Sequence, residues 1–109
     1  LYDKILLTLR RARVATEGRD VEGRVTNLLA VHDMVTELKV ALDHEVGGRI
    51  SRDLDALYAF MLGELMAANR HADVARIDVV LRIAGELREA FAGALAQLSA
   101  GAPAAARIA

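Results

Sequence analysis

Apolar residues recur at intervals of three and four along almost the whole chain, and this periodicity is the strongest constraint on its fold. Near the N-terminus, for example, Ile5, Leu9 and Ala12 would share one face of a helix. Strand-like alternation is nearly absent, and the only proline, Pro103, interrupts no periodic segment. The sequence therefore predicts an all-α protein.

Four periodic segments separated by short breaks predict the architecture. They cover residues 1 to about 17, about 21 to 43, 49 or 51 to about 69–72, and 73 to about 99. Short connections between long helices force neighbouring helices to run antiparallel, which predicts an up-down-up-down four-helix bundle over residues 1–99. Residues 100–109 are rich in alanine and are expected to form a flexible tail.

Polar residues and glycines predict where these helices begin and end. Asp20 and Asp73 are suited to accept hydrogen bonds from the free N–H groups that start the second and fourth helices, and Ser51 could do so for the third. Gly18 would take the left-handed conformation just past the first helix. The paired glycines in residues 44–48 predict a connection that breaks the helix.

Composition and charge argue against several classes of protein. The formal net charge is −1, so no overall basic character suggests a nucleic-acid partner. No uninterrupted apolar run approaches the roughly 18 residues of a membrane-spanning helix. The absence of cysteine excludes disulfides, thiol catalysis and thiolate metal sites. We therefore expect neither nucleic-acid binding nor membrane insertion.

The histidines and acidic residues form no recognisable catalytic or metal-binding motif. A di-iron bundle requires a glutamate three residues before a histidine. The positions three residues before His32, His44 and His71 hold no glutamate, and no nucleophile or phosphate-binding motif is present. We expect no catalytic residue and no metal ligand, so an enzyme or metalloprotein on a helical scaffold is the disfavoured alternative.

Apolar residues beside the main helical stripes predict a partner-binding surface. Five such residues are candidates for partner contact: Leu7, Val31, Met34, Leu38 and Tyr58. They could pack inside a bundle with wide core faces, or line a groove that receives an amphipathic helix from a partner. A further alternative is a non-enzymatic structural module that self-associates through the same stripes.

Three segments resemble the flagellar secretion chaperone FliS family. The chain opens with Leu1-Tyr2-Asp3-Lys4, and residues 54–58 read LDALY, with a methionine and a leucine following at the family's spacing. Residues 42–50, with their paired glycines, and residues 85–91, which end in Phe91, resemble further parts of the family pattern. The resemblance covers about residues 1–99.

The resemblance implies a cytoplasmic bacterial protein that acts by binding another protein. The family binds the C-terminal helical segment of newly made flagellin, which is otherwise disordered. Binding prevents premature polymerisation and aids delivery of flagellin to the components of the flagellar export apparatus. The resemblance implies no cofactor and no catalytic activity.

Overall fold

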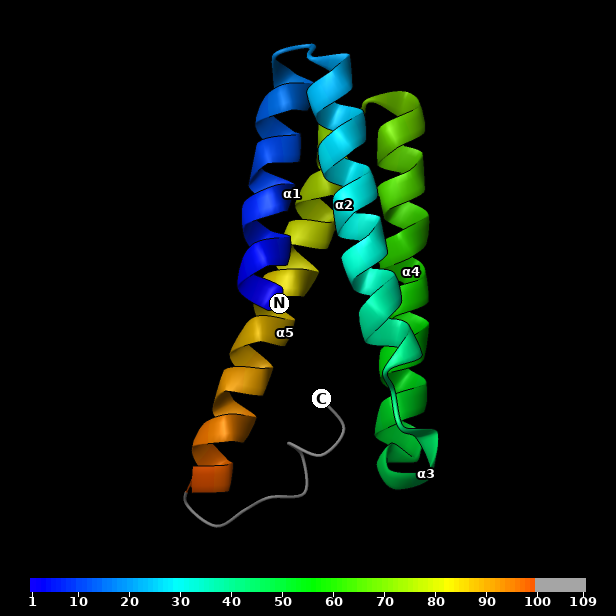
Figure 1. Ribbon diagram of the computed structural model, residues 1–109, viewed down its shortest axis with the longest axis vertical. Coiled ribbons are helices and arrows are strands. Elements are labelled where there is room, and N and C mark those ends of the chain that lie inside the picture. The colour runs from blue at the N-terminus through cyan, green and yellow to red at the C-terminus, as the bar shows by residue number, and fades with distance from the viewer. Residues whose placement is uncertain (100–109) are drawn as a thin grey trace.

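The computed structural model describes residues 1–99, and this part of the chain is all-helical, as predicted (Figure 1). It contains five helices, not the four expected: α1 (Tyr2–Glu17), α2 (Val21–Val40), α3 (His44–Gly47), α4 (Arg49–His71) and α5 (Val74–Ser99). The additional helix, α3, is a single turn in the connection between α2 and α4. The predicted tail, residues 100–109, lies outside the described residues.

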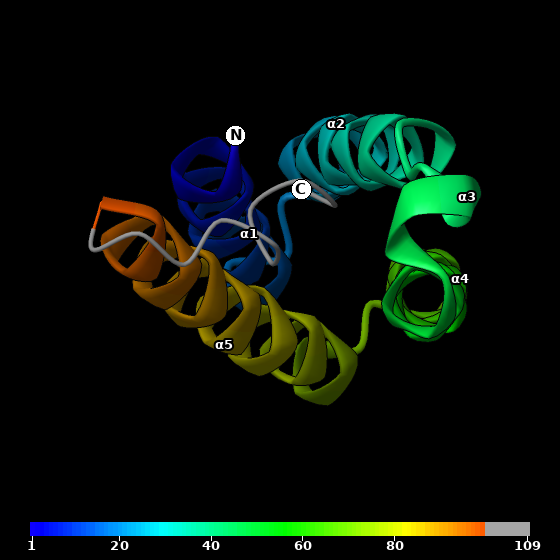
Figure 2. The same cartoon turned by 90° about the horizontal axis from the view of Figure 1, so that it is seen from below.

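The four long helices lie side by side and enclose one core. α1 packs against α2 and α5, and α4 packs against the same two helices, so the contacts close a ring (Figure 2). The C-terminal part of α5 extends well beyond the first residue of α1 (Figure 1). The ring of helices is therefore complete at one end of the molecule and incomplete at the other.

The core consists of the periodic aliphatic residues that predicted the helices. Each long helix supplies side chains with at most 1% exposure: Ile5, Leu9, Leu28, Val31, Val35, Met61, Leu65, Ile77 and Val80. Burying a large aliphatic side chain contributes roughly 1.5–3 kcal/mol, so this cluster is the main source of stability. Among the described residues, no buried side-chain nitrogen or oxygen lacks a hydrogen-bond partner.

Two of the three predicted helix starts are confirmed. Asp20 accepts a hydrogen bond from the Gly23 N–H at 3.0 Å, and Asp73 accepts one from the Ala75 N–H at 3.0 Å. Ser51 is not a cap, because α4 already begins at Arg49. Its buried hydroxyl instead donates to the Asp43 carbonyl at 2.9 Å, which ties the first turn of α4 to the preceding connection.

The predicted break over residues 44–48 contains a helical turn. The Asp43 carboxylate accepts hydrogen bonds from the N–H groups of Glu45 at 3.1 Å and Val46 at 3.0 Å. This cap allows the following residues to form α3. The chain reverses at Gly48, whose φ of +53° and ψ of −121° are accessible to glycine and strained for other residues.

Left-handed backbone occurs at residues other than the predicted one. Gly18 has a φ of −83°, so its predicted left-handed conformation is wrong. The adjacent Arg19, with a φ of 58°, and Ala72, with a φ of 50°, adopt left-handed backbone instead. A residue with a Cβ pays roughly 1–2 kcal/mol in this region, so both positions carry local strain.

The strain at Ala72 predicts a stabilising substitution. Ala72→Gly should raise the free energy of unfolding by about 1 kcal/mol, because glycine adopts the left-handed end of α4 without a Cβ clash. Urea denaturation followed by circular dichroism measures the change. Ala59→Gly, at an exposed position inside α4, is the matched control and should lower stability by about 0.5–1 kcal/mol. An equal loss of stability in both variants would contradict the assignment of strain to Ala72.

Candidate partner-binding surface

A pair of tyrosines sets the position of α1 relative to α4. The hydroxyl oxygens of Tyr2 and Tyr58 lie 2.7 Å apart and share a hydrogen bond. The Tyr2 ring also stacks on Phe91 of α5, with ring centroids 5.3 Å apart and planes 24° from parallel. Three helices therefore meet at the level of Tyr58 along the long axis of the molecule, and α1 begins at this level.

Because α1 begins at the height of Tyr58, the first turns of α4 extend beyond it. The core-facing residues of this extension are uncovered: Ile50 is 51% exposed, and Leu54 and Leu57 are half-buried. Farther along the same face of α4, where α1 is present, Met61 and Leu65 are buried. The change from exposed to buried along one helical face follows the extent of α1.

α2 and the connection that follows it contribute the second wall of this region. Leu38 and Leu42 are half-buried and, with Leu54 and Leu57, pack against the edge of the core. The Lys39 ammonium and the Asp55 carboxylate form an ion pair at 3.0 Å, which connects α2 and α4 at this height. We define the open-end surface as the five aliphatic residues that line this region: Leu38, Leu42, Ile50, Leu54 and Leu57.

The five sequence-predicted contact residues occupy different environments. Leu38 is part of the open-end surface, and Leu7 is 46% exposed on the outer face of α1. Val31, Met34 and Tyr58 are buried in the core cluster, with exposures of 0%, 7% and 2%. Their helical phase placed them beside the main stripes, whereas the core is wide enough to include them. The structure therefore gathers four of the five in or beside the core, and Leu7 lies apart from them.

Sequence reasoning did not single out most of the open-end surface. Leu42, Ile50, Leu54 and Leu57 fall on ordinary core positions of their helices, and their spacing is that of any buried residue. Only the position of α1 shows that they are partly uncovered. Their occurrence in the segment that resembles the family pattern was the one available signal.

Two kinds of feature are absent from the described residues. Within residues 1–99, no group of three or more histidine, aspartate or glutamate side chains is placed to hold a metal ion. Nor does this part of the chain contain a helix long and apolar enough to cross a bilayer. The open-end surface is aliphatic, and such a surface is suited to packing against a partner helix.

The fold and this surface define an all-helical protein suited to contact with another protein. Comparison with known families agrees: the model for the family described as "Flagellar protein FliS" matches residues 1–98. The chain belongs to this family, as its resemblance had predicted.

Curated relatives support the same assignment. The chain is 34% identical over 91 residues to the flagellar secretion chaperone FliS of Campylobacter jejuni, covering 84% of this chain and 71% of the relative. It is 34% identical over 92 residues to the protein of the same name in Salmonella typhimurium, and 28% identical over 92 residues to that of Escherichia coli. Each of these two alignments covers 84% of this chain and 68% of the relative.

The tyrosine pair predicts a loss of stability at alkaline pH. Burial raises the pKa of both Tyr2 and Tyr58 above the ordinary value of 10.0, and for Tyr2 the hydrogen bond to Tyr58 adds to this effect. The folded state therefore favours neutral phenols. The resulting stabilisation is complete below pH of about 10 and is lost as the pH rises through the raised folded-state pKa values.

Urea denaturation between pH of about 8 and 11.5 tests this expectation. The free energy of unfolding should fall above pH of about 10, and Tyr2→Phe should reduce the slope of that fall because one titrating group is removed. Phe91→Leu, which disturbs the same aromatic cluster without removing a titrating group, should lower stability at every pH and leave the slope unchanged. An unchanged slope in Tyr2→Phe would contradict the role of the pair.

Proposed function

We propose that this chain is a cytoplasmic export chaperone that binds the C-terminal helical region of flagellin. Binding prevents premature polymerisation of flagellin and aids its delivery to components of the flagellar export apparatus. Membership of the FliS family supports this role, since its curated relatives are named as flagellar secretion chaperones. The open-end surface is the structural observation that carries the proposal.

The physical requirements of a disordered client agree with the open-end surface. A segment that folds on binding must bury on the order of 1,000 Å² or more to offset the entropy of ordering. The aliphatic side chains of the open-end surface contribute apolar area toward this requirement without demanding exact hydrogen-bond geometry. The open-end surface is continuous with the core through Leu54 and Leu57, so an amphipathic client helix would complete the core where α1 does not cover it.

The candidate contact residues have different parts in this proposal. Leu38 contacts the client on the open-end surface, and Leu7 offers a second exposed contact on α1. Tyr58, Met34 and Val31 are buried in the core and are reached by the client only if the helices separate.

The proposal includes the up-down-up-down arrangement of four antiparallel long helices. The closed ring of contacts among α1, α2, α4 and α5, together with the short connections, supports this topology. Such a bundle presents long, nearly parallel walls, which suit a helical client. The proposed function requires no catalytic step, metal or cofactor, since apolar packing alone holds the client.

Calorimetric titration tests the proposed client. We expect a peptide of about forty residues from the C-terminus of flagellin to bind saturably, with a large negative change in heat capacity from apolar burial. Sedimentation of the free chain is measured in parallel. Self-association of the free chain without peptide binding would contradict the proposal and favour the self-associating structural module.

A matched pair of substitutions tests the open-end surface. Ile50→Asp should weaken peptide binding about tenfold or more, because loss of one large apolar contact removes roughly 1.5–3 kcal/mol. Ile50 lies in the first turn of α4, which contains no acidic residue, so an aspartate there is favourable to the helix dipole and should not unfold the chain. The experiment therefore separates binding from stability.

The control is Val21→Asp at the opposite end of the molecule. Val21 is 58% exposed and lies in the first turn of α2, as Ile50 does in α4, so the control places the same new charge in the first turn of a helix. It should leave the affinity for the flagellin peptide unchanged. Equal weakening in both variants would show that charge, and not the open-end surface, determines binding.

A further inference from the structure

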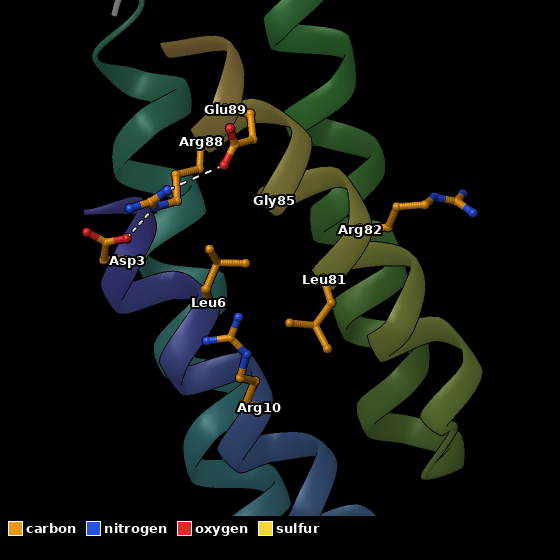
Figure 3. A pocket seen from close by; sticks show the side chains of 8 residues that line it. All are labelled: Asp3, Leu6, Arg10, Leu81, Arg82, Gly85, Arg88 and Glu89. Atoms are coloured by element: carbon orange, nitrogen blue, oxygen red, sulfur yellow. Dashed lines mark hydrogen bonds and ion pairs between the residues drawn. The ribbon is translucent and has the colours of Figure 1, made fainter. Parts of the chain in front are cut away.

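A second surface feature lies between α1 and α5. It is a hollow of about 680 Å³, open to solvent, and Leu6, Arg10, Leu81, Arg82, Gly85 and Arg88 are among the residues that line it (Figure 3). It lies along the seam between these two helices, whereas the open-end surface belongs to α2 and α4. The two surfaces are therefore made by different pairs of helices.

The charges along this seam are paired at both ends and unpaired in the middle. At one end, Arg88 of α5 donates to Asp3 of α1, and this hydrogen bond lowers the pKa of the Asp3 carboxyl. At the other end, the Nε of Arg13 lies 2.6 Å from an Asp78 carboxylate oxygen. Each of these ion pairs joins an arginine on one helix to a carboxylate on the other.

Between these ion pairs, both helices present an arginine. Arg10 on α1 and Arg82 on α5 line the hollow, although the Arg82 side chain extends away from α1 (Figure 3). Neither arginine forms an ion pair or a side-chain hydrogen bond with any residue of the described part of the chain. The chain as a whole has a net charge of −1, so this pair is a local positive site and not part of a general basic surface. At each end of the seam an arginine faces a carboxylate on the other helix. In the middle, no carboxylate pairs with Arg10 or Arg82.

The floor of the hollow is apolar and has room for a side chain. Leu6 and Leu81 point toward each other from the two helices (Figure 3). Gly85 lies beside them, and a Cβ built on it would meet no atom within 4 Å. An aliphatic group could therefore rest against Leu6 and Leu81 next to Gly85, below the level of the arginines.

We propose that this hollow docks an acidic, amphipathic helical segment of a partner protein. An aliphatic side chain of the partner packs on the floor at Leu6, Leu81 and Gly85. One carboxylate of the partner, a helical turn away, pairs with Arg10, and Arg82 turns toward the partner to pair with a second. Arginine is suited to this role, because its planar guanidinium binds a carboxylate through two hydrogen bonds. A hollow between two adjacent helices favours a third helix with contacts at three- and four-residue spacing.

The lining distinguishes this occupant from other anions. A free phosphate or carboxylate would gain nothing from the apolar floor. A nucleic-acid backbone likewise carries no aliphatic side chain that could pack on this floor. The combination of an aliphatic floor with two unpaired arginines is met by a peptide that carries both kinds of group. The proposal does not depend on the flagellin client.

The probe is a designed helical peptide of about fourteen residues, with one leucine stripe flanked by glutamates at three- and four-residue spacing. A second peptide replaces each glutamate with glutamine. Fluorescence anisotropy measures the affinity, and amide chemical shifts of the full chain locate the site. We expect the acidic peptide to shift the amides around Arg10, Arg82 and Gly85, and to bind about tenfold or more tightly than its glutamine counterpart. Equal affinity of the two peptides, or shifts elsewhere, would overturn the proposal.

Variants of the chain separate this site from general charge effects. Arg10→Glu and Arg82→Glu should each weaken binding of the acidic peptide about tenfold, and Gly85→Leu should weaken it by filling the floor. Arg52→Glu is the matched control, since Arg52 is an exposed arginine on α4 outside the hollow, and it should leave the affinity unchanged. All four positions lie on the surface or face open space, and circular dichroism checks that each variant remains folded.

Two results of these binding experiments would overturn the proposal. Equal weakening by Arg52→Glu would assign the binding to net charge alone. Saturation of the Arg10 and Arg82 amide shifts by sodium citrate or inorganic phosphate, with no shift from the acidic peptide, would show a site for small anions and not a docking surface for a helix.

Discussion

The contact between Tyr2 and Tyr58 determines how much of the core is covered. It holds the first turn of α1 at the middle of α4, and the stacking of Tyr2 on Phe91 brings α5 into the same junction. On one side of this junction four helices enclose the core. On the other side, α2 and α4 continue with core-facing residues that α1 does not reach, and these residues form the open-end surface.

This arrangement leaves one apolar surface partly exposed while the rest of the core stays buried. Along a single face of α4, Ile50 is exposed, Leu54 is half-buried, and Met61 and Leu65 are buried. The surface is thus a continuation of the core, held in place by the packing that stabilises the rest of the fold. A bound helix would meet side chains already ordered by their neighbours, which reduces the entropic cost of binding.

The ion pairs have a different part in the structure. Those between α1 and α5 lie on the solvent side of the seam, where exposed pairs contribute little to stability. The pattern they form is more informative than their energy. Arg88 and Arg13 each form an ion pair with a carboxylate of the facing helix, whereas Arg10 and Arg82, which line the hollow with the apolar floor, form none. The apolar open-end surface and this mixed seam could therefore bind partners of different chemistry at the same time.

The sequence alone determined the helical class, the approximate extents of the long helices, the caps at Asp20 and Asp73, and the family. These depend on local spacing and on hydrogen bonds between residues close in the chain. It could not place the left-handed residue after α1, because Gly18 and Arg19 are neighbours and helical spacing does not tell which of them takes a positive φ. Nor could it show that Val31, Met34 and Tyr58 are buried while Ile50 is exposed. All four occupy apolar positions with helical spacing. Only the point along α4 at which α1 begins, marked by a hydrogen bond between residues 56 positions apart, separates core from surface.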